Sequence, residues 1–515
     1  MMRKREMEVV AAIDIGSNSL RMIIAEITKT KINILEDLNK TAYMGRDTFS
    51  FGRINPETIH KICDILSGFS QVMKEYGVKC YWAVSTSGIR EAENREYVLE
   101  QIRINTGILV EVINNSQERF YIYKALHDRL PNAKEIFNDG ALILNVGSGG
   151  VEVSVYEGGN LKFTEYLKLG PLRLMEILSD IKGEVLDFPA LIGEFIDSKI
   201  YILKSYIKQM KIKNFIGLGG NIRIIEKLGI QGEDSGFIDR EWFFKLTNRI
   251  SSMSIQNISE EFDLSQAEAE LLLCSVIIFA RFLNMSEAKG IYAPKASLRN
   301  GLIADMADEK FNTERKKIFK KDILSSVWYI GEKYGIDKYH CKHVEKLAIF
   351  IFDHIGKVHR LGEKERTYLR VAAILHDVGK YIDLNRHDEQ CYNIIHNEHI
   401  IGFSDRDTNI TANVAKYHGE QIPSFLDENY RELNYKDKII VSKLAAILKL
   451  AESLDISHKQ RINKLQVEVE DKKIYFKINK NQDTLLEEWN FNNYTKFFEE
   501  VMGVKPVIIN GSAKG

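Results

Sequence analysis

Cysteine is scarce in this chain of 515 residues, which contains only five. These are Cys63, Cys80, Cys274, Cys341 and Cys391, and no two of them have the spacing of a metal knuckle or a redox motif. A disulfide framework is therefore not indicated, and the simple interpretation is a protein of a reducing compartment.

Long hydrophobic runs are also lacking. The longest, near LLLCSVIIFA, is too short to cross a bilayer and is followed by Arg281. The N-terminal stretch MMRKREMEVV is basic, but Asp14 interrupts the apolar run that follows, which makes a poor secretion signal. We therefore expect a cytoplasmic protein with no membrane partner.

An excess of charge of one sign is missing as well. Lys and Arg number 71 and Asp and Glu 72, which gives a net charge of -1. A general nucleic-acid binder usually carries a basic excess, so no nucleic-acid partner is expected. Because the net charge is only -1, a polyanionic ligand would need a local concentration of positive charge. Two basic clusters could supply it, or they could be ordinary solvated helix faces. The clusters are Lys204, Lys208, Lys211 and Lys213, and Arg315, Lys316, Lys317, Lys320 and Lys321.

Size and histidine distribution point to several domains. At roughly 100–200 residues per domain, the length predicts about three to four domains. Ten of the twelve histidines lie between His340 and His458. This segment is predicted to be a separate domain, which either has its own chemistry or uses histidine for polar packing.

The first 300 residues alternate strand-like and helix-like patterns, which is typical of an α/β fold. Strands are expected at VVAAIDIG, SLRMIIAEI, INILED and YWAVSTSG, and helices at PETIHKICDILSGFSQVMKEYG and REAENREYVLEQIRINTG. The pattern is then almost wholly helical from ERKKIFKKDIL to about His458. A β-hairpin around Asp471, a helix at LLEEWNFNNYTKFFEEVMG and a strand at VKPVII follow.

A weak internal repeat relates AAIDIGSNSLRMIIAE to LILNVGSGGVEVSVYE. Each is a strand, a tight turn of small residues and a second strand. The repeat suggests duplicated α/β halves with a cleft between them, although two unrelated hairpins with similar turns would look alike. In a duplicated fold, Asp14 and Asn145 would face each other across the cleft.

The turns GSNS and GSGG could surround phosphate oxygens with backbone N–H groups and hydroxyls. Asp14 and Asn145 could then hold a hydrated Mg²⁺. Thr86, Ser87 and Gly88 end a strand, and Arg90 is expected to open the next helix, a position suited to an anion or to an ordinary helix cap. Glu118 begins another helix, where a carboxylate also complements the helix dipole.

These segments resemble the exopolyphosphatase/guanosine pentaphosphate phosphatase family, of the actin-like ATPase and sugar kinase superfamily. The resemblance covers about residues 8–305. It rests, in family order, on AAIDIGSNSLRMIIAE, STSGIREAEN, SQERFYIYKAL, LNVGSGGVEV, LKLGPLRLME, GLGGNIRII and APKASLRNGLI. It implies duplicated actin-like (ribonuclease H-like) halves and hydrolytic release of a terminal phosphate.

The resemblance also implies roles for individual residues. Glu118 would position the attacking water, Asp14, Asn145 and Glu152 would hold Mg²⁺, and Arg90 would contact phosphate. The remaining substrate-binding positions would be Gly16, Ser17, Asn18, Ser19, Thr86, Ser87, Gly147, Ser148, Gly149, Gly219 and Gly220.

Three positions depart from the family pattern. Asn145 stands where an aspartate is usual, Arg119 where a glutamate usually follows the water-positioning residue, and Asn300 where the end motif has glutamate. Loss of one acidic ligand would weaken metal binding. A catalytically weak homologue that senses polyphosphate or the alarmone is therefore an alternative to an active enzyme.

The segment LRVAAILHDVGKYID resembles the HD superfamily of metal-dependent phosphohydrolases. The resemblance implies a divalent metal site at His340, His376, Asp377 and Glu452, with Asp455 near the last position. Three interpretations stay open: a working hydrolase, a structural metal site or a metal-free helical domain.

Together these observations predict two actin-like halves (residues 1–128 and 129–308), a helical HD-type domain (309–460) and a small α/β domain (461–515). The predicted function is Mg²⁺-dependent exopolyphosphatase. Guanosine pentaphosphate 5′-phosphohydrolase is the alternative enzyme. A homodimer is expected from the habit of the family.

Overall fold

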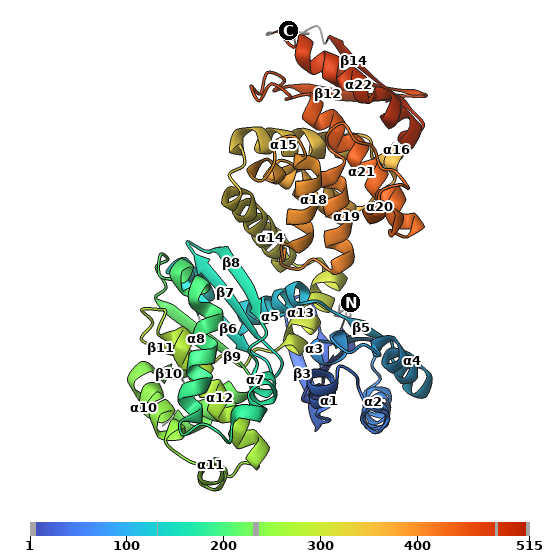
Figure 1. Cartoon of the computed structure of the whole chain (residues 1–515). Helices are drawn as coiled ribbons and strands as arrows, with labels where there is room; N and C mark the ends of the chain where they lie inside the picture. Colours follow the sequence, from blue (N-terminus) through green and yellow to red (C-terminus); the bar gives the residue numbers. More distant parts are fainter. Residues whose placement is uncertain (1–6, 131, 230–235, 479–482, 511–515) are drawn as a thin grey trace. The chain divides into compact units, whose positions relative to one another are not determined.

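Two units make up the computed structural model, which describes residues 7–130, 132–229, 236–478 and 483–510. Unit 1 is Met1–Asp322 and unit 2 is Ile323–Gly515. The colours in Figure 1 run from blue to yellow through unit 1 and from yellow to red through unit 2.

The N-terminal part of unit 1 contains a five-stranded sheet of order β3-β2-β1-β4-β5. Strands β1, β2 and β3 are antiparallel neighbours, whereas β4 runs parallel to β1 and β5 parallel to β4. Strands β1 and β2 are apolar almost throughout because both faces are buried, as is usual for central strands covered by helices. The strands are β1 (Glu8–Ile15), β2 (Ser19–Ile27), β3 (Ile32–Thr41), β4 (Cys80–Ser85) and β5 (Val110–Val112), and the helices are α1 (Met44–Phe51), α2 (Pro56–Glu75), α3 (Ser87–Arg90), α4 (Arg95–Thr106), α5 (Asn115–Arg129) and α6 (Ala133–Asn138).

The second part of unit 1 contains a six-stranded sheet of order β10-β11-β9-β6-β7-β8. Its strands are β6 (Ala141–Val146), β7 (Val151–Glu157), β8 (Asn160–Leu167), β9 (Asn214–Gly219), β10 (Phe237–Asp239) and β11 (Gly290–Tyr292). The helices that follow along the chain are α7 (Pro171–Ile177), η1 (Ser179–Ile181), α8 (Phe188–Ile207), α9 (Gly220–Gly229), α10 (Arg240–Ser251), α11 (Ile255–Phe262), α12 (Gln266–Leu283) and α13 (Leu298–Phe311). Of these, α13 returns to the first part, where it packs against α5, β1 and β2. Strands β8, β7, β6 and β9 repeat the order and directions of β3, β2, β1 and β4.

The structure confirms the two hairpins that the sequence predicts. In the first, Asp14 pairs with Arg21 across β1 and β2, and in the second, Asn145 pairs with Glu152 across β6 and β7. Two local predictions are wrong. Thr86, Ser87 and Gly88 do not end a strand, because β4 ends at Ser85 and Ser87 begins the short helix α3. Arg90 does not open a long helix but ends the short helix α3, and α4 begins only at Arg95. Residues 91–94 form a bend between the two helices.

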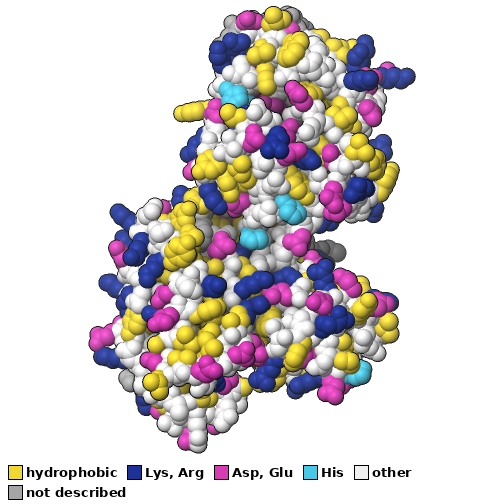
Figure 2. Space-filling view, in the orientation of Figure 1, with side chains coloured by type: hydrophobic (Ala, Val, Ile, Leu, Met, Phe, Trp, Pro, Cys, Tyr) yellow, Lys and Arg dark blue, Asp and Glu magenta, His cyan; other side chains and the backbone are white. Residues whose placement is uncertain are grey.

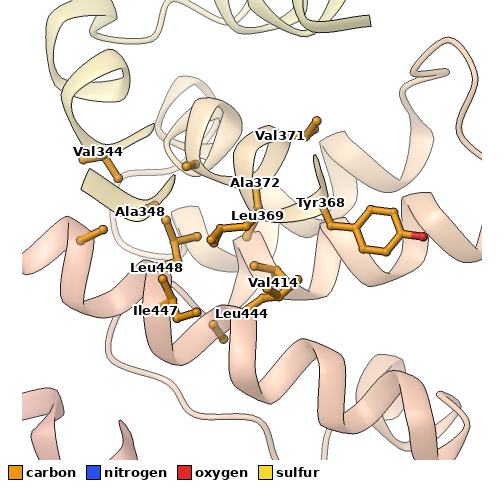
Figure 3. Close-up of a cluster of buried hydrophobic side chains, with 14 of the residues drawn as sticks. Val344, Ala348, Tyr368, Leu369, Val371, Ala372, Val414, Leu444, Ile447 and Leu448 are labelled. Carbon is orange, nitrogen blue, oxygen red and sulfur yellow. The ribbon is translucent and has the colours of Figure 1, made fainter. Parts of the chain in front are cut away.

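Unit 2 is a helical bundle followed by a three-stranded sheet of order β12-β13-β14. The long helix α21 packs against α15, α17, α19 and α22. Figure 3 shows side chains of this core, among them Leu369, Val414 and Leu448. The elements are α14 (Glu314–Lys333), which begins in unit 1, α15 (Lys338–His354), α16 (Gly356–His359), α17 (Glu363–Leu375), η2 (Val378–Tyr381), α18 (His387–Asn397), α19 (Asp405–Lys416), α20 (Glu428–Arg431), α21 (Tyr435–Ser453), β12 (Leu465–Glu470), β13 (Lys473–Ile478), α22 (Leu485–Met502) and β14 (Lys505–Asn510).

The C-terminal strands and helix were predicted correctly. The hairpin β12–β13 turns at Asp471, and β14 adds to β13 in parallel. Phe476, Phe491 and Phe498 join the same buried cluster as the helices of the bundle. The four-domain division stays a prediction. No helix among the described residues is long and apolar enough to cross a membrane.

Candidate active site

A cleft of about 740 Å³ lies in unit 1, where the turns of both hairpins meet the end of β4 and the first turn of α5. Of the residues predicted for this site, all except Gly220 line the cleft. Gly220 begins α9 directly after the lining residue Gly219. The structure therefore brings together residues that are far apart in the sequence, and their individual roles stay predictions.

Two glycine turns from different sheets both approach Ser87 at this cleft. Gly16 N–H donates to Ser19 O over 3.1 Å, and Gly147 N–H donates to Gly150 O over 2.9 Å, so both turns close in the same way. A Cβ atom on Gly149 would lie 2.9 Å from Ser87 Oγ. The hydroxyl oxygens of Ser87 and Ser17 are 2.9 Å apart. Only glycine fits this approach, which leaves backbone and hydroxyl groups to face a ligand.

Glu118 lies in the first turn of α5, where the side chain of Asn114 caps the helix. Glu118 Oε2 is 3.9 Å from Arg90 Nη1. Arg90 is fixed by hydrogen bonds to Ile113 O (2.7 Å) and Asn115 Oδ1 (2.5 Å). Helix α5 packs closely against α13. A Cβ on Gly301 of α13 would overlap the Tyr121 carbonyl of α5, so this close approach requires glycine.

The acid of Glu118 is unusually weak. Burial, followed by the nearby carboxylates of Glu152 and Asp14, raises the pKa of Glu118 to about 8, although the guanidinium of Arg90 opposes this shift. A bound cation would favour the ionised form. A carboxyl group poised near neutral pH has the acidity expected of a general base.

The proposed metal ligands include one buried oxygen that has no partner. Glu152 is 5% exposed, and its Oε2 accepts a hydrogen bond from Asn145 Nδ2 over 3.1 Å. Its Oε1 is buried and has no hydrogen-bond partner among the residues that the structure describes. Burial also raises the pKa values of Glu152 and Asp14. A buried carboxylate oxygen without a donor fits a hard divalent cation such as Mg²⁺.

Arg119, the second departure from the family pattern, is a buried cation at the same site. It is 3% exposed, and only its Nη2 has a hydrogen bond, to Ser116 Oγ over 3.1 Å. Its Nε and Nη1 are buried and find no hydrogen-bond partner within the described part of the chain, and burial lowers its pKa. The cation lowers the pKa values of Glu152 and Glu118. It therefore offsets part of the mutual repulsion among the acids.

The sequence analysis assigned no role to four further cations that line the cleft: Arg21, Arg223, Lys295 and Arg299. Arg223 donates to the carbonyl of Ala293, and Arg299 donates to that of Met22. Three of the four lie in the segments GLGGNIRII and APKASLRNGLI, which were recognised only as family segments. The match of these two segments to the family was the sequence signal that could have pointed to these cations.

Two residues of one predicted basic cluster are paired with acids. Arg315 Nη2 is 2.9 Å from Asp308 Oδ1, and Lys316 Nζ is 2.8 Å from Glu309 Oε2. On the face drawn in Figure 2, basic and acidic side chains are interspersed. The role of the basic clusters in guiding a polyanion stays a prediction.

The residues predicted as a metal site in unit 2 also lie together. His340 Nε2 is 3.2 Å from His376 Nε2 and 3.0 Å from Glu452 Oε2, and Asp377 Oδ1 is 3.7 Å from His376 Nε2. Asp455 is on the other side of the His340 ring, where its Oδ2 is 2.9 Å from Nδ1. Glu452, rather than Asp455, therefore belongs to the group around the two Nε2 atoms.

Unit 1 is therefore an α/β unit in which two mixed sheets bring their glycine turns and buried acids together at one cleft. Residues 23–310 match the Ppx/GppA phosphatase family, and residues 324–494 match Ppx/GppA phosphatase, domain III. The chain belongs to the Ppx/GppA phosphatase family, as its sequence motifs predicted.

Individual relatives span most of the chain. The guanosine-5'-triphosphate,3'-diphosphate pyrophosphatase of Vibrio vulnificus (strain YJ016) is 21% identical over 85% of this chain and 86% of its own length. The protein of the same name from Aliivibrio fischeri (strain ATCC 700601 / ES114) is 21% identical over 89% of this chain and 91% of its own length.

Solved structures match a smaller part of the chain. An exopolyphosphatase from Cytophaga hutchinsonii has a TM-score of 0.54 and 18% identity over 59% of this chain and 98% of its own. The Aquifex aeolicus member of the Ppx/GppA family has a TM-score of 0.50 and 23% identity over 59% and 99%. These likenesses establish the fold of the matched part.

Proposed function

We propose that this protein is an exopolyphosphatase that releases terminal orthophosphate from inorganic polyphosphate in the cleft of unit 1. The observation that carries the proposal is the position of Glu118, beside Arg90 and at a cleft lined by the glycine turns of both sheets. This combination offers anion-binding groups and one acid suited to orient water. The family membership supports phosphoanhydride hydrolysis as the reaction.

In the proposed mechanism, the turns at residues 16–19 and 147–150 bind the terminal phosphates through backbone N–H and hydroxyl groups. Arg90 neutralises a phosphate oxygen and holds the end of the chain in line with the water. The ionised Glu118 takes a proton from that water as its oxygen attacks the terminal phosphorus. The bond to the bridging oxygen breaks, and the shortened chain leaves as an anion, so that one orthophosphate is formed.

Asp14, Asn145 and Glu152 would hold Mg²⁺, and the unpartnered Glu152 Oε1 supports this assignment. When bound, the ion would neutralise charge on the phosphate oxygens. The amide of Asn145 positions Glu152 and adds no further negative charge to the group. The metal requirement is part of the proposal.

A second candidate is guanosine pentaphosphate 5′-phosphohydrolase. The names of the Vibrio and Aliivibrio relatives favour it. The composition of the cleft favours the polymer, because Tyr166 is the sole aromatic residue among its described lining residues, and a purine pocket commonly offers a stacking surface. A third candidate, a weakly catalytic sensor of either ligand, is motivated by Asn145.

Phosphate release separates the three candidates. The purified full chain should be tested with long polyphosphate, short polyphosphate and guanosine pentaphosphate, with and without Mg²⁺. The proposal expects Mg²⁺-dependent release that is fastest with long polyphosphate and lost in Glu118→Gln. Faster release from the nucleotide would favour the second candidate. Tight binding of either ligand without turnover would favour the third.

The finer architecture belongs to the same proposal. Matching strand order and directions in the two sheets support duplicated actin-like halves. The helical part of unit 2, with its buried His and Asp side chains, supports an HD-type domain. A homodimer in the cytoplasm is proposed on the habit of the family and on the scarcity of cysteine. Light scattering of the purified chain would test the dimer.

A further inference from the structure

The proposed mechanism gives no role to Arg173, a largely buried cation in α7. The first residue of this helix, Pro171, lines the cleft. Helix α7 is attached to the glycine turn of the second hairpin, because the backbone N–H groups of Leu172 and Arg173 donate to Ser148 O over 3.1 and 3.4 Å. The start of α7 and the turn at residues 147–150 therefore form one structural piece.

The side chain of Arg173 extends from this piece to the first part of unit 1. Its Nε donates to Gly149 O over 2.7 Å, and its Nη2 donates to Glu91 Oε2 over 2.6 Å. The guanidinium also lies over the ring of Phe49, 4.2 Å from its centroid. The exposed fractions of the Arg173 and Glu91 side chains are 13% and 22%, so this charge-assisted contact is stronger than an ordinary surface ion pair.

The carboxylate that Arg173 contacts belongs to the element that carries Arg90. Glu91 directly follows Arg90, which is the last residue of α3. The backbone N–H of Glu91 donates to Ser87 O over 3.1 Å, which ties Glu91 to the start of the same helix. Ser87 and Arg90 both line the cleft. A group that holds Glu91 therefore also holds the phosphate-binding side of α3.

The other end of the link is the peptide between Gly149 and Gly150. A peptide unit is planar and trans, so fixing the carbonyl of Gly149 also fixes the direction of the Gly150 N–H. The backbone of this turn is one of the two proposed phosphate-binding loops. Through its two hydrogen bonds, Arg173 thus sets the separation between this loop and Arg90.

We propose that Arg173 is a positioning residue for phosphate release, because it holds the turn at residues 147–150 at a fixed distance from Arg90. This inference rests on the proposed function. In-line attack on phosphorus is sensitive to small displacements of the reacting groups, whereas the groups that bind the anion stay in place on each side of the cleft. Loss of the link should therefore lower kcat more than it raises KM.

The alternative is that Arg173 only stabilises the packing of α7 against α1. A second link between these two helices offers a matched control. Ser50 Oγ donates to Glu176 Oε2 over 2.6 Å at an exposed position. Ser50→Ala breaks a contact between α1 and α7 without releasing Gly149, so it should leave kcat and KM unchanged.

The test is steady-state phosphate release from long polyphosphate by the full chain. Arg173→Met should lower kcat at least tenfold and change KM by less than about threefold. Arg173→Lys keeps the charge but lacks the planar fork that reaches both partners, so it should recover part of kcat. Circular dichroism checks that each variant is folded. Native kcat in folded Arg173→Met, or an equal loss in Ser50→Ala, would overturn the positioning role.

Glu91→Gln tests whether the two side chains act through one link. Alone, this conservative change should lower kcat several-fold, because a neutral amide binds the guanidinium less strongly. Combined with Arg173→Met it should cost nothing more, since the link is already broken, and additive losses would contradict the proposal. A native chain that releases no phosphate from polyphosphate would overturn the proposed function and this role together. Native turnover with unaltered Arg173→Met kinetics would overturn this role alone.

Discussion

The side-chain amide of Asn145 donates a hydrogen bond to Glu152 Oε2 over 3.1 Å, across the hairpin that joins β6 to β7. An aspartate at this position would place a second carboxylate beside a buried one. The asparagine therefore lacks the charge of an acidic metal ligand, and its neutral amide supports Glu152 by a hydrogen bond.

Asn145→Asp should make the protein more dependent on metal. Without Mg²⁺, repulsion between the two acids should lower the melting temperature, because a buried like-charge contact is unfavourable. With Mg²⁺, the added ligand charge should raise the apparent Mg²⁺ affinity several-fold. Thermal melting and phosphate release across a Mg²⁺ series would measure both effects. Unchanged Mg²⁺ dependence would show that residue 145 lies outside the metal shell.

Glu118→Gln should slow turnover strongly with little effect on substrate affinity. The amide keeps the shape of the side chain but cannot accept the proton, and loss of a general base typically costs about 10²–10⁴-fold in rate. Steady-state kinetics with polyphosphate would check this. Glu96→Gln, at an exposed position of α4, is the matched control and should be as active as the native chain. Full activity of Glu118→Gln would remove the basis of the mechanism.

The same substitution should stabilise the metal-free protein at alkaline pH. The pKa of Glu118 is raised from 4.5 to about 8 in the folded chain, so the folded state holds its proton where the unfolded state has lost it. The free energy of unfolding therefore falls as the pH rises from about 4.5 to about 8. Glu118→Gln removes this loss and should gain up to about 5 kcal/mol above pH 8, since a difference of one in pKa corresponds to about 1.4 kcal/mol. Urea unfolding at pH 5 and pH 8.5 would measure it, and an equal effect at both pH values would contradict it.

Gly149→Ala should push the second hairpin away from α1 and α3. A Cβ there would lie 2.5 Å from Phe49 Cζ and 2.9 Å from Ser87 Oγ, so the hairpin or these side chains must move. We expect at least a tenfold loss of kcat/KM, because small misplacements of reacting groups are costly. Gly183→Ala is the control, since nothing lies within 4 Å of its Cβ position. Native kcat/KM in Gly149→Ala would show that the contact does not matter.

Much of the fold could be predicted from the sequence because the local hydrophobic and turn patterns were strong. The hairpin at Asp14 and the first turn of α5 at Glu118 follow from apolar strands, small-residue turns and a capping asparagine. The placement of Arg90 was missed because a four-residue helix has no periodicity to read. The positions of cleft residues such as Arg223 could not be predicted, because they depend on hydrogen bonds to carbonyl groups that are far away in the sequence.

The cluster in unit 2 shows the same limit. His376 and Asp377 were recognised from their adjacent positions in an apolar helix. No metal-binding role was predicted for His418 from the sequence. The distance between His418 and Asp377 depends on how the end of α19 packs against the end of α17, and the sequence does not reveal this tertiary packing.

Arg119→Met would test whether the buried guanidinium tunes the pKa of the catalytic base, Glu118. The change removes a buried guanidinium whose Nε and Nη1 have no hydrogen-bond partners among the described residues. Because an apolar side chain of similar length needs no buried hydrogen bonds, the free energy of unfolding should change little or rise. It also removes a cation that lowers the pKa values of Glu118 and Glu152. The rising limb of the pH–rate profile should therefore move to higher pH, with less effect on the rate at the plateau. Arg129→Met, at the exposed end of α5, is the matched control and should leave the profile in place. A profile that does not move in Arg119→Met would mean that Arg119 does not act on the acid that controls the rate.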